Sequence, residues 1–305
     1  MDKSKICFIR AKLKKDYVFD GIAKSGYRII TPYTDRNIVL RVCRELWKKL
    51  KLPKISIWYN KETKNIEQKI IIVKDPIITT DFIRFLREHN PDRYIIFDYD
   101  NRVSRSLDPE SIRTYVDEIW SYDEDDCEKY NLRIKGHSYL DVYQTKPNQI
   151  RKYDVFYVGR DKGRLNQIHE MERKLQEHGL KTFFYICADR EYLTWTSKEY
   201  KHFLPYEGYL DLLKDSKAIL NIVPEGQTSI TQREMEAVFD GVKCITNNKG
   251  ILDFPLYDPS RYFILDNNYD LLLDFLESDF KKIEDNELEQ YRFSNGVERM
   301  VSDLI

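Results

Sequence analysis

Short apolar runs alternate with longer amphipathic stretches along almost the whole chain, and this pattern limits the fold most strongly. Such alternation is typical of βα units around a mainly parallel sheet, so we predict an α/β protein. In the first half the predicted strands are 5–10, 27–31, 54–59, 69–73, 94–98 and 118–122, with helices near 36–50, 79–89 and 108–117. In the second half they are 153–158, 181–187, 217–223, 242–246 and 261–265, with helices at 164–178, 206–214, 231–240 and 268–277.

The chain length and one interruption of the pattern predict two domains. A chain of 305 residues suggests about two domains of roughly 150 residues each. Near 123–150 the alternation gives way to an acidic helical turn and a polar stretch, which we interpret as the linker. The predicted domains are therefore 1–148 and 149–283, and 284–305 is predicted to be a helical segment that packs back across them.

Composition argues against several other classes of protein. There is no run of ~18 apolar residues, so no membrane-spanning helix is expected. The N-terminus lacks the longer apolar segment of a signal peptide, and we therefore predict a cytoplasmic protein. The five cysteines and five histidines are scattered, without the spacing of a disulfide frame or a zinc site. Neither a metal nor another cofactor is expected.

Positive charge is concentrated at the N-terminal end, where residues 1–54 hold fifteen Lys and Arg against five Asp and Glu. Such an excess predicts an anionic partner. Segment 36–51 has an apolar and a basic helical face, and we expect its apolar stripe to cover the sheet. Its basic face, with Lys12, Lys14 and Lys15 nearby in sequence, is predicted to meet anionic lipid headgroups. Nucleic acid is disfavoured because no recognition module accompanies the charge.

The segment 153–164 is a buried strand that ends in Gly159 and is followed by Arg160, Lys162 and Arg164. Ligands of open α/β sheets bind where strands end, and three cations there suit a diphosphate. The alternative is an ordinary βα turn with solvated charges. The loop lacks the glycine spacing of the dinucleotide-binding fingerprint, and no phosphate-binding P-loop occurs in the chain.

The segment 223–248 predicts a polar loop, a helix start, one short helix and a buried strand. Arg233 and Glu236 project from the first turns of that helix. Free N–H groups and the helix dipole favour a bound anion at such a start, although a well-capped βα unit is the plainer interpretation. The donors and the predicted N-cap ahead of the helix are Gln227, Thr228, Ser229 and Thr231.

Together these segments resemble GT-B glycosyltransferases, in particular the bacterial surface-polysaccharide group that includes lipopolysaccharide-core enzymes. The matching phrases lie at 118–132, 153–164, 205–210, 226–237 and 242–248. The resemblance implies two Rossmann-like domains, with an acceptor-binding domain at 1–148 and a nucleotide-sugar-binding domain at 149–283. It implies hexose transfer from a nucleotide-diphosphate sugar to a glycan acceptor, which we expect to be lipid-linked.

The resemblance assigns the donor diphosphate to Arg160 and Lys162, a supporting charge to Arg164 and the ribose hydroxyls to Glu236. The chemistry agrees, because a carboxylate accepts two hydrogen bonds from a vicinal diol and cations stabilise a leaving diphosphate without a metal. Arg233 could reach the same phosphates or remain a solvated helix residue.

Two further positions follow from the same resemblance. Tyr206 and Glu207 lie where the family places residues around the base and ribose, although Tyr206 could equally belong to the core. Relatives with a Glu-x7-Glu pattern carry a first glutamate at the position of Thr228. The sugar contact of that acid is therefore in doubt here, and Gln227 is a candidate to replace it.

In the first domain, Asp98 and Asp100 end an apolar strand, and either could deprotonate an acceptor hydroxyl as a general base. Asp20 is a second candidate base. Asp-x-Asp is also the metal–diphosphate motif of the GT-A fold, so a metal-dependent transferase is one alternative, and a solvated pair is another. A non-catalytic partner of a glycan assembly complex, binding sugar nucleotide or lipid, is the alternative from a different class.

Overall fold

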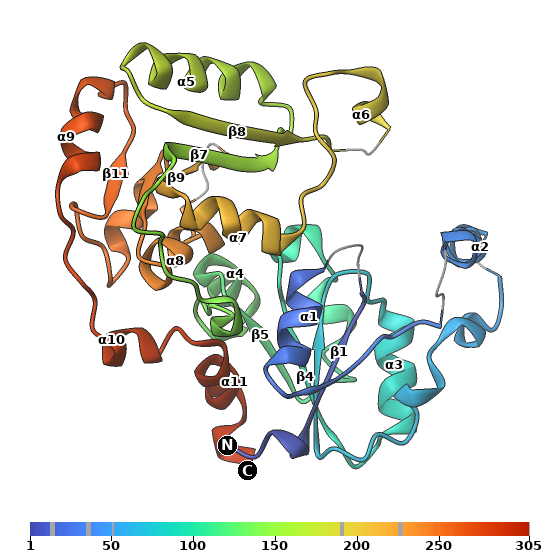
Figure 1. Cartoon of the computed structure of the whole chain (residues 1–305). Coiled ribbons are helices and arrows are strands. Elements are labelled where there is room, and N and C mark those ends of the chain that lie inside the picture. Colours follow the sequence, from blue (N-terminus) through green and yellow to red (C-terminus); the bar gives the residue numbers. More distant parts are fainter. Residues whose placement is uncertain (13–15, 35–37, 51, 190–191, 225–227, 305) are drawn as a thin grey trace. The chain divides into compact units, whose positions relative to one another are not determined.

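The computed structural model describes residues 1–12, 16–34, 38–50, 52–189, 192–224 and 228–304 (Figure 1). The chain forms two compact units, one of Met1–Val142 with Phe293–Ile305 and one of Tyr143–Arg292. The first division therefore falls after Val142, whereas the sequence predicted it after residue 148.

The first unit contains a six-stranded sheet in the order β2-β1-β3-β4-β5-β6, and every strand pair in it is parallel. The direction of strand order reverses at β1. Its strands are β1 (Ile6–Arg10), β2 (Arg28–Ile30), β3 (Ile70–Lys74), β4 (Tyr94–Asp98), β5 (Glu118–Ser121) and β6 (Arg133–Ile134). Its helices are α1 (Tyr17–Lys24), α2 (Ile38–Lys49), α3 (Thr80–His89), α4 (Glu124–Tyr130) and α11 (Phe293–Val301).

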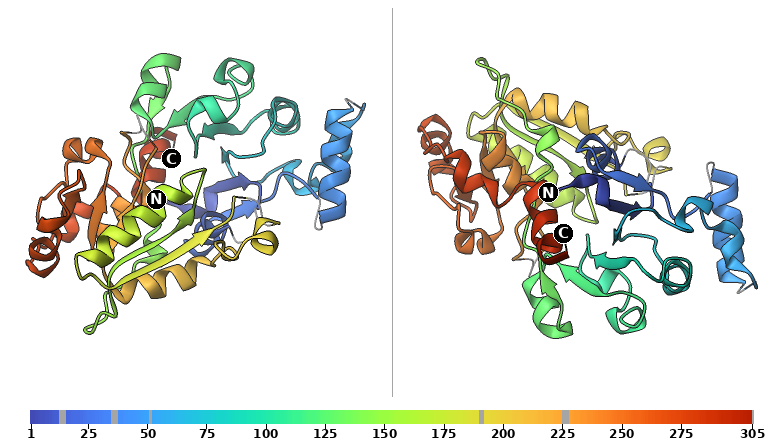
Figure 2. Two further views of the ribbon diagram at one scale, coloured as in Figure 1. Left: turned by 90° about the horizontal axis from the view of Figure 1, so that it is seen from above. Right: turned by 90° about the horizontal axis from the view of Figure 1, so that it is seen from below.

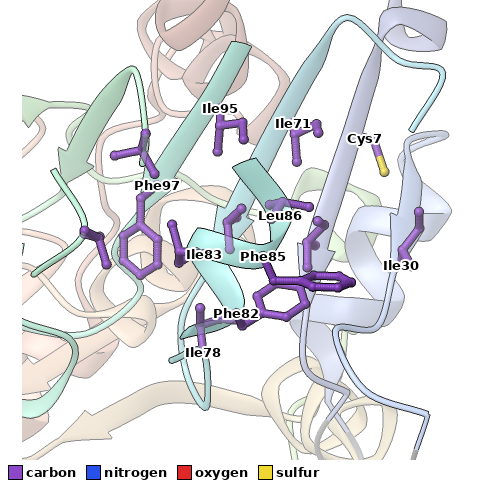
Figure 3. Close-up of a cluster of buried hydrophobic side chains, with 14 of the residues drawn as sticks. Cys7, Ile30, Ile71, Ile78, Phe82, Ile83, Phe85, Leu86, Ile95 and Phe97 are labelled. Atoms are coloured by element: carbon purple, nitrogen blue, oxygen red, sulfur yellow. The ribbon is translucent and has the colours of Figure 1, made fainter. Parts of the chain in front are cut away.

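The core of this unit lies between the sheet and α3, as Figure 3 shows. Every residue of β1 and β3 is buried, which explains why these strands are continuous apolar runs. Phe82, Ile83 and Leu86 of α3 face alternate residues of the strands, among them Cys7 and Ile71. The side chain of Thr79 fixes the start of α3 by accepting a hydrogen bond from Phe82 N at 3.3 Å.

The second unit contains a five-stranded parallel sheet in the order β11-β10-β9-β7-β8. Its strands are β7 (Tyr153–Arg160), β8 (Thr182–Cys187), β9 (Ser216–Asn221), β10 (Lys243–Thr246) and β11 (Tyr262–Ile264). Its helices are α5 (Leu165–Glu177), α6 (Leu193–Thr196), α7 (Tyr206–Lys214), α8 (Gln232–Phe239), α9 (Leu272–Glu277) and α10 (Asp285–Glu289). Two parallel sheets with helices confirm the predicted α/β class.

The predicted C-terminal segment 284–305 is not one element. It forms α10 in the second unit and α11 in the first. Phe293 of α11 has its ring centroid 5.9 Å from those of Phe8 and Tyr27, and its N–H donates to Tyr139 O at 2.8 Å. Helix α11 is therefore part of the core of the first unit.

Three sequence predictions in the first unit were wrong. Residues 54–59 form the 3₁₀ turn η2 (Ile55–Trp58), because Lys54 takes a left-handed conformation with φ of 59° and interrupts the extended backbone. The helix predicted at 108–117 is reduced to the turn η5 (Pro109–Ser111), capped by Asp108. The apolar stripe of α2 does not cover the sheet, since Val42 and Leu46 are 52% and 51% exposed. Among the described residues, no helix has both the length and the apolarity needed to cross a bilayer.

Candidate functional site

In the second sheet the strand order reverses between β7 and β9. The residues singled out from the sequence gather at this point. β7 has β8 on one side and β9 on the other, so the connections from its two neighbours leave in opposite directions. Ligands of open α/β sheets bind at the carboxyl ends of the strands at such a reversal. β7 ends at Arg160 and is followed by the loop that contains Lys162, and the segment after β9 leads into α8.

The loop after β7 is shaped by a buried aspartate. Asp161 accepts hydrogen bonds from Tyr200 Oη at 2.6 Å and from Gly163 N at 3.4 Å. Lys162 and Gly163 follow with positive φ values of 48° and 78°. The turn leaves the side chains of Arg160 and Lys162 exposed to solvent. Among the described residues no carboxylate forms an ion pair with Arg160.

Arg164 has a different position from the other two cations of the loop. Its guanidinium donates to the carbonyl oxygens of Asp161 at 3.2 Å and of Ile222 at 3.0 Å. Ile222 directly follows β9, so this side chain joins the backbone at the ends of the two strands. The structure therefore gives Arg164 a role in holding the loop, beside the supporting charge predicted for it.

Gly159 and Arg233 bring the two predicted donor segments into contact. A Cβ at Gly159 would lie 2.9 Å from Nη2 of Arg233 and 2.9 Å from the hydroxyl oxygen of Tyr157. The Arg233 guanidinium donates to Val158 O and lies 5.7 Å from the centroid of the Tyr157 ring. Only glycine fits at the end of β7 without moving these groups.

The start of α8 is fixed by a capping box that the sequence analysis did not identify. Thr231 Oγ1 accepts from Glu234 N at 3.4 Å, and Glu234 Oε2 accepts from Thr231 N at 2.7 Å. Thr-x-x-Glu before a helix is the sequence signal of this motif. Glu234 is fully buried and also accepts from Asn221 and Asn248. Thr231 therefore serves as the N-cap, as expected.

The remaining polar residues of this segment are only partly described. Thr228 is exposed and Ser229 is half-buried, immediately before the capping box. Ser229 O accepts a hydrogen bond from Asn248 Nδ2 at 3.3 Å, which connects the segment to the second residue after β10. Gln227 lies outside the described residues. The sugar contact predicted for Gln227 and the donor role predicted for Thr228 and Ser229 stay predictions.

Glu236 is a buried carboxylate surrounded by tyrosines, and its side chain is 1% exposed. Its Oε1 accepts from Tyr206 Oη at 2.8 Å, and its Oε2 accepts from Tyr209 Oη. The two tyrosine rings stack with centroids 5.5 Å apart. Burial raises the pKa of Glu236 to about 7, although both tyrosine hydroxyls and Arg233 act in the opposite direction. Such a perturbed carboxyl is typical of functional sites.

In the first unit, charged residues follow the carboxyl ends of neighbouring strands. Arg10, Lys74 and Asp98 are the last residues of β1, β3 and β4, and they stand in register with one another. Lys74 Nζ is 2.8 Å from Asp100 Oδ1 and also pairs with Asp98. Arg10 pairs with Asp100, and Lys135 pairs with Asp98. The two predicted carboxylates are therefore held by three buried cations.

These ion pairs change what the carboxylates can do. Burial alone would raise the pKa of Asp100, but Lys74 and Arg10 lower it to about 2. A carboxylate with so low a pKa is a weak general base near neutral pH. Asp20, the other candidate base, is on α1 and forms an ion pair with Lys12 at 2.8 Å. Within the described ranges no three His, Cys, Asp or Glu side chains gather as a metal site requires. The catalytic roles of Asp98 and Asp100 stay predictions.

The sequence analysis missed Arg10, Lys74 and Lys135. Each of the first two is the polar residue that ends a continuous apolar run, which is the available signal. Lys135 follows the two-residue strand β6, which was not predicted. The site in the first unit is thus a row of alternating charges, whereas the sequence suggested an isolated pair of acids.

No protein-family model and no curated protein matches the chain. Solved structures with a similar fold include the lipopolysaccharide outer core galactosyltransferase WaaB in its apo form, with a TM-score of 0.52 at 13% identity over 98% of this chain and 99% of that one. The DNA-modifying enzyme β-glucosyltransferase has a TM-score of 0.51 at 13% identity, covering 97% of this chain and 95% of that one.

A third similar structure is a putative UDP-N-acetylglucosamine 2-epimerase from Listeria monocytogenes, with a TM-score of 0.51 at 9% identity, 98% of this chain and 95% of that one. Likenesses at such low identity concern the fold, and the same fold can host different reactions. They extend over both units of the chain. The chain therefore has the two-domain α/β fold of the GT-B glycosyltransferases.

Proposed function

We propose that the protein is a glycosyltransferase that moves a hexose from a nucleotide-diphosphate sugar to a lipid-linked surface glycan, at the cytoplasmic face of the membrane and without a metal. The observation that carries the proposal is the arrangement at the β7–β9 reversal. Exposed cations follow β7, and the buried carboxylate of Glu236 is on α8, whose Arg233 contacts the end of β7. Two of the similar folds are a galactosyltransferase and a glucosyltransferase.

In the proposed donor complex, Arg160 and Lys162 bind the diphosphate beside the backbone of Gly159. The first N–H groups of α8 add a favourable dipole for the same anion. Arg164 keeps the loop in place through its two carbonyl contacts. As the sugar is transferred, negative charge develops on the leaving diphosphate, and cations already in position stabilise it.

Glu236 is proposed to bind the ribose hydroxyls. An ionised carboxylate has about four acceptor positions, and the tyrosine hydroxyls occupy two of them. Tyr206 is half-buried at the first position of α7, whereas Tyr209 is buried. A ribose hydroxyl is therefore expected to use one of the remaining acceptor positions on the side of Tyr206, the less buried of the two tyrosines.

A thermal-shift screen with UDP-, GDP-, CDP- and dTDP-hexoses tests the proposal. A ligand present at ~100 times its dissociation constant, and bound only by the folded protein, stabilises it by roughly 2.7 kcal/mol. We expect one nucleotide class to raise the melting temperature of the native protein and to lose this effect in Arg160→Ala. Transfer to a lipid-linked acceptor should then be detected with that donor.

The alternatives predict different results. Turnover that disappears on full chelation would favour the metal-dependent mechanism through Asp98 and Asp100. Binding of a donor without turnover, for every acceptor tested, would favour a non-catalytic partner of an assembly complex and overturn the proposal. Conversion of the sugar on its nucleotide, without transfer, would indicate epimerase chemistry on the same fold.

A further inference from the structure

Helix α2 is oriented with its apolar face toward solvent. Val42 is 52% exposed, Leu46 51% and Leu50 67%. Figure 1 and Figure 2 show α2 apart from α3, which covers the sheet of the same unit. At 100° per residue six of the exposed apolar side chains share one side of the helix. They are Ile38, Val39, Val42, Cys43, Leu46 and Leu50, and we refer to them as the α2 stripe.

The opposite side of α2 attaches the helix to its unit. Arg44 is buried, and its guanidinium lies 3.9 Å from the centroid of the Tyr33 ring. The Trp47 ring lies 6.1 Å from that of Trp58, and its Nε1 donates to Pro53 O at 3.0 Å. Cation–π and aromatic contacts therefore fix the helix with its polar side inward. This orientation is the reverse of an ordinary sheet-covering helix. The basic face that was predicted to meet lipid headgroups is turned toward the unit, with Arg44 buried.

We propose that α2 is an interfacial helix that lies in the plane of an anionic lipid bilayer with the α2 stripe among the acyl chains. An outward apolar face on a helix rich in Lys and Arg is the arrangement that membrane-surface helices use. The helix has Arg41, Arg44, Lys48 and Lys49 against one acid, Glu45.

The positive charge of the N-terminal region favours an anionic lipid surface over a protein as the partner of α2. The fifteen Lys and Arg of residues 1–54 outnumber their five Asp and Glu, and a leaflet of anionic lipid attracts such an excess. The cores of protein interfaces, by contrast, are depleted of Lys. The long side chains at the margin of the stripe can reach the headgroups while the apolar residues lie deeper. The α2 stripe is thus the surface through which the proposed membrane-associated enzyme would contact the bilayer, and this contact does not depend on the donor chemistry.

Co-sedimentation with vesicles tests this proposal. We expect the native protein to bind vesicles of phosphatidylglycerol and phosphatidylcholine, and to bind pure phosphatidylcholine more weakly. The double variant Leu46→Ser/Leu50→Ser should bind the anionic vesicles at least about tenfold more weakly, because two exposed leucines no longer enter the bilayer. Part of the native binding should persist at about 0.5 M salt, where surface charges are screened.

A matched control comes from the second unit. Leu271 and Leu273 are also exposed leucines, at 58% and 48%, near the start of α9. The variant Leu271→Ser/Leu273→Ser should bind vesicles as the native protein does. Equal binding by Leu46→Ser/Leu50→Ser and the native protein would overturn the proposal. Loss of self-association in Leu46→Ser/Leu50→Ser would overturn it as well, because a second copy of the chain would then be the partner.

Cys43 provides a second measurement on the stripe itself. It is exposed, whereas Cys7, Cys187 and Cys244 are buried. With the half-buried Cys127 replaced by Ser, an environment-sensitive fluorophore attached to Cys43 should shift its emission to the blue on addition of the anionic vesicles. Unchanged emission would contradict insertion. Neither experiment contains a donor, so failure here leaves the thermal-shift result intact, and the converse also holds.

Discussion

Gly159 and Arg233 meet at the carboxyl end of β7, where a Cβ on the glycine would lie 2.9 Å from Nη2 of the arginine. The two residues belong to the two segments that were separately predicted to bind the donor. Arg233 also donates to Val158 O, so the end of β7 is in direct contact with α8, the helix that follows β9.

Substitution of Gly159 by Ala should therefore damage both stability and the donor site. The new Cβ would displace the ends of the Arg233 and Tyr157 side chains, and overpacking of this kind costs about 1–3 kcal/mol. Donor affinity, measured by titration calorimetry, should fall as Arg233 moves. Gly179→Ala is the control, because Gly179 has φ of 79° with open space around its Cβ. It should lower stability through backbone strain and keep native affinity.

Arg160→Ala and Arg164→Ala should have opposite signatures. Loss of the charge-assisted contact from Arg160 should weaken donor binding by tenfold or more, which corresponds to at least about 1.4 kcal/mol. Because Arg160 is exposed, its loss should not change the melting temperature of the protein without donor. Arg164 donates to two backbone carbonyls, so its loss should lower the melting temperature. Melting curves without donor, compared with donor titrations, separate the two. A similar fall in melting temperature for both variants would contradict the assignment of donor binding to Arg160 and of loop stability to Arg164.

Glu236→Gln should change the pH dependence of stability. The pKa of Glu236 is about 7 in the folded protein against an ordinary 4.5, so the folded state binds its proton more tightly. The free energy of unfolding that this group contributes therefore falls as pH rises from about 4.5 to about 7, by on the order of 3 kcal/mol.

Glutamine does not ionise and can still hydrogen-bond to Tyr206 and Tyr209. The variant should therefore gain stability relative to the native protein between about pH 5 and pH 8. Urea unfolding at a series of pH values measures this difference. Parallel curves for the two proteins would show that Glu236 is not perturbed. Donor binding by the variant should be weaker at every pH, because a neutral amide accepts fewer hydrogen bonds from the ribose.

Asp100→Asn should destabilise the first unit at neutral pH. The pKa of Asp100 is about 2 against an ordinary 3.8, so its ionised form stabilises the fold above about pH 4 and this contribution is lost toward pH 2. Removing the charge leaves Arg10 and Lys74 with fewer partners, which costs on the order of 3 kcal/mol.

Urea unfolding of the native protein and Asp100→Asn at about pH 7 and about pH 3 tests this prediction. The difference in the free energy of unfolding between the two proteins should be smaller at the acid pH. Asp81→Asn is the control, because Asp81 pairs with Arg84 on the exposed surface of α3 and surface pairs contribute little. An Asp100→Asn protein as stable as the native one at neutral pH would show that the row of charges is not needed for folding.

The strands buried on both faces could be predicted from the sequence. β1, β3 and β4 are uninterrupted apolar runs, and the sequence placed each within a residue or two of its observed position. The segment 54–59 alternates like a strand, yet Tyr59 pairs with Tyr33 in an isolated bridge after the η2 turn. For α2, periodicity predicted the helix and its two faces, but it contains no information about which face is inward.

The sites needed the order of the strands. Arg233 reaches Val158 O only because β9, which leads to α8, lies beside β7. Asp98 and Asp100 acquire their cations because β1 and β3 lie on one side of β4, and Lys135 follows β6 on the other. None of these neighbours is close in sequence. Local patterns identified the acids and the cations of the second unit, but they did not identify Arg10, Lys74 and Lys135. Pairing between strands determined the roles of all these residues.

The contribution of Phe293 to the first unit has a consequence for how the chain folds as it is synthesised. Residues 143–292 form the second unit as one uninterrupted stretch, whereas the first unit also needs Phe293, Val297 and Met300, which are buried in it. Domains fold in the order in which their residues leave the ribosome. The first unit can thus be completed only after the whole of the second unit has emerged.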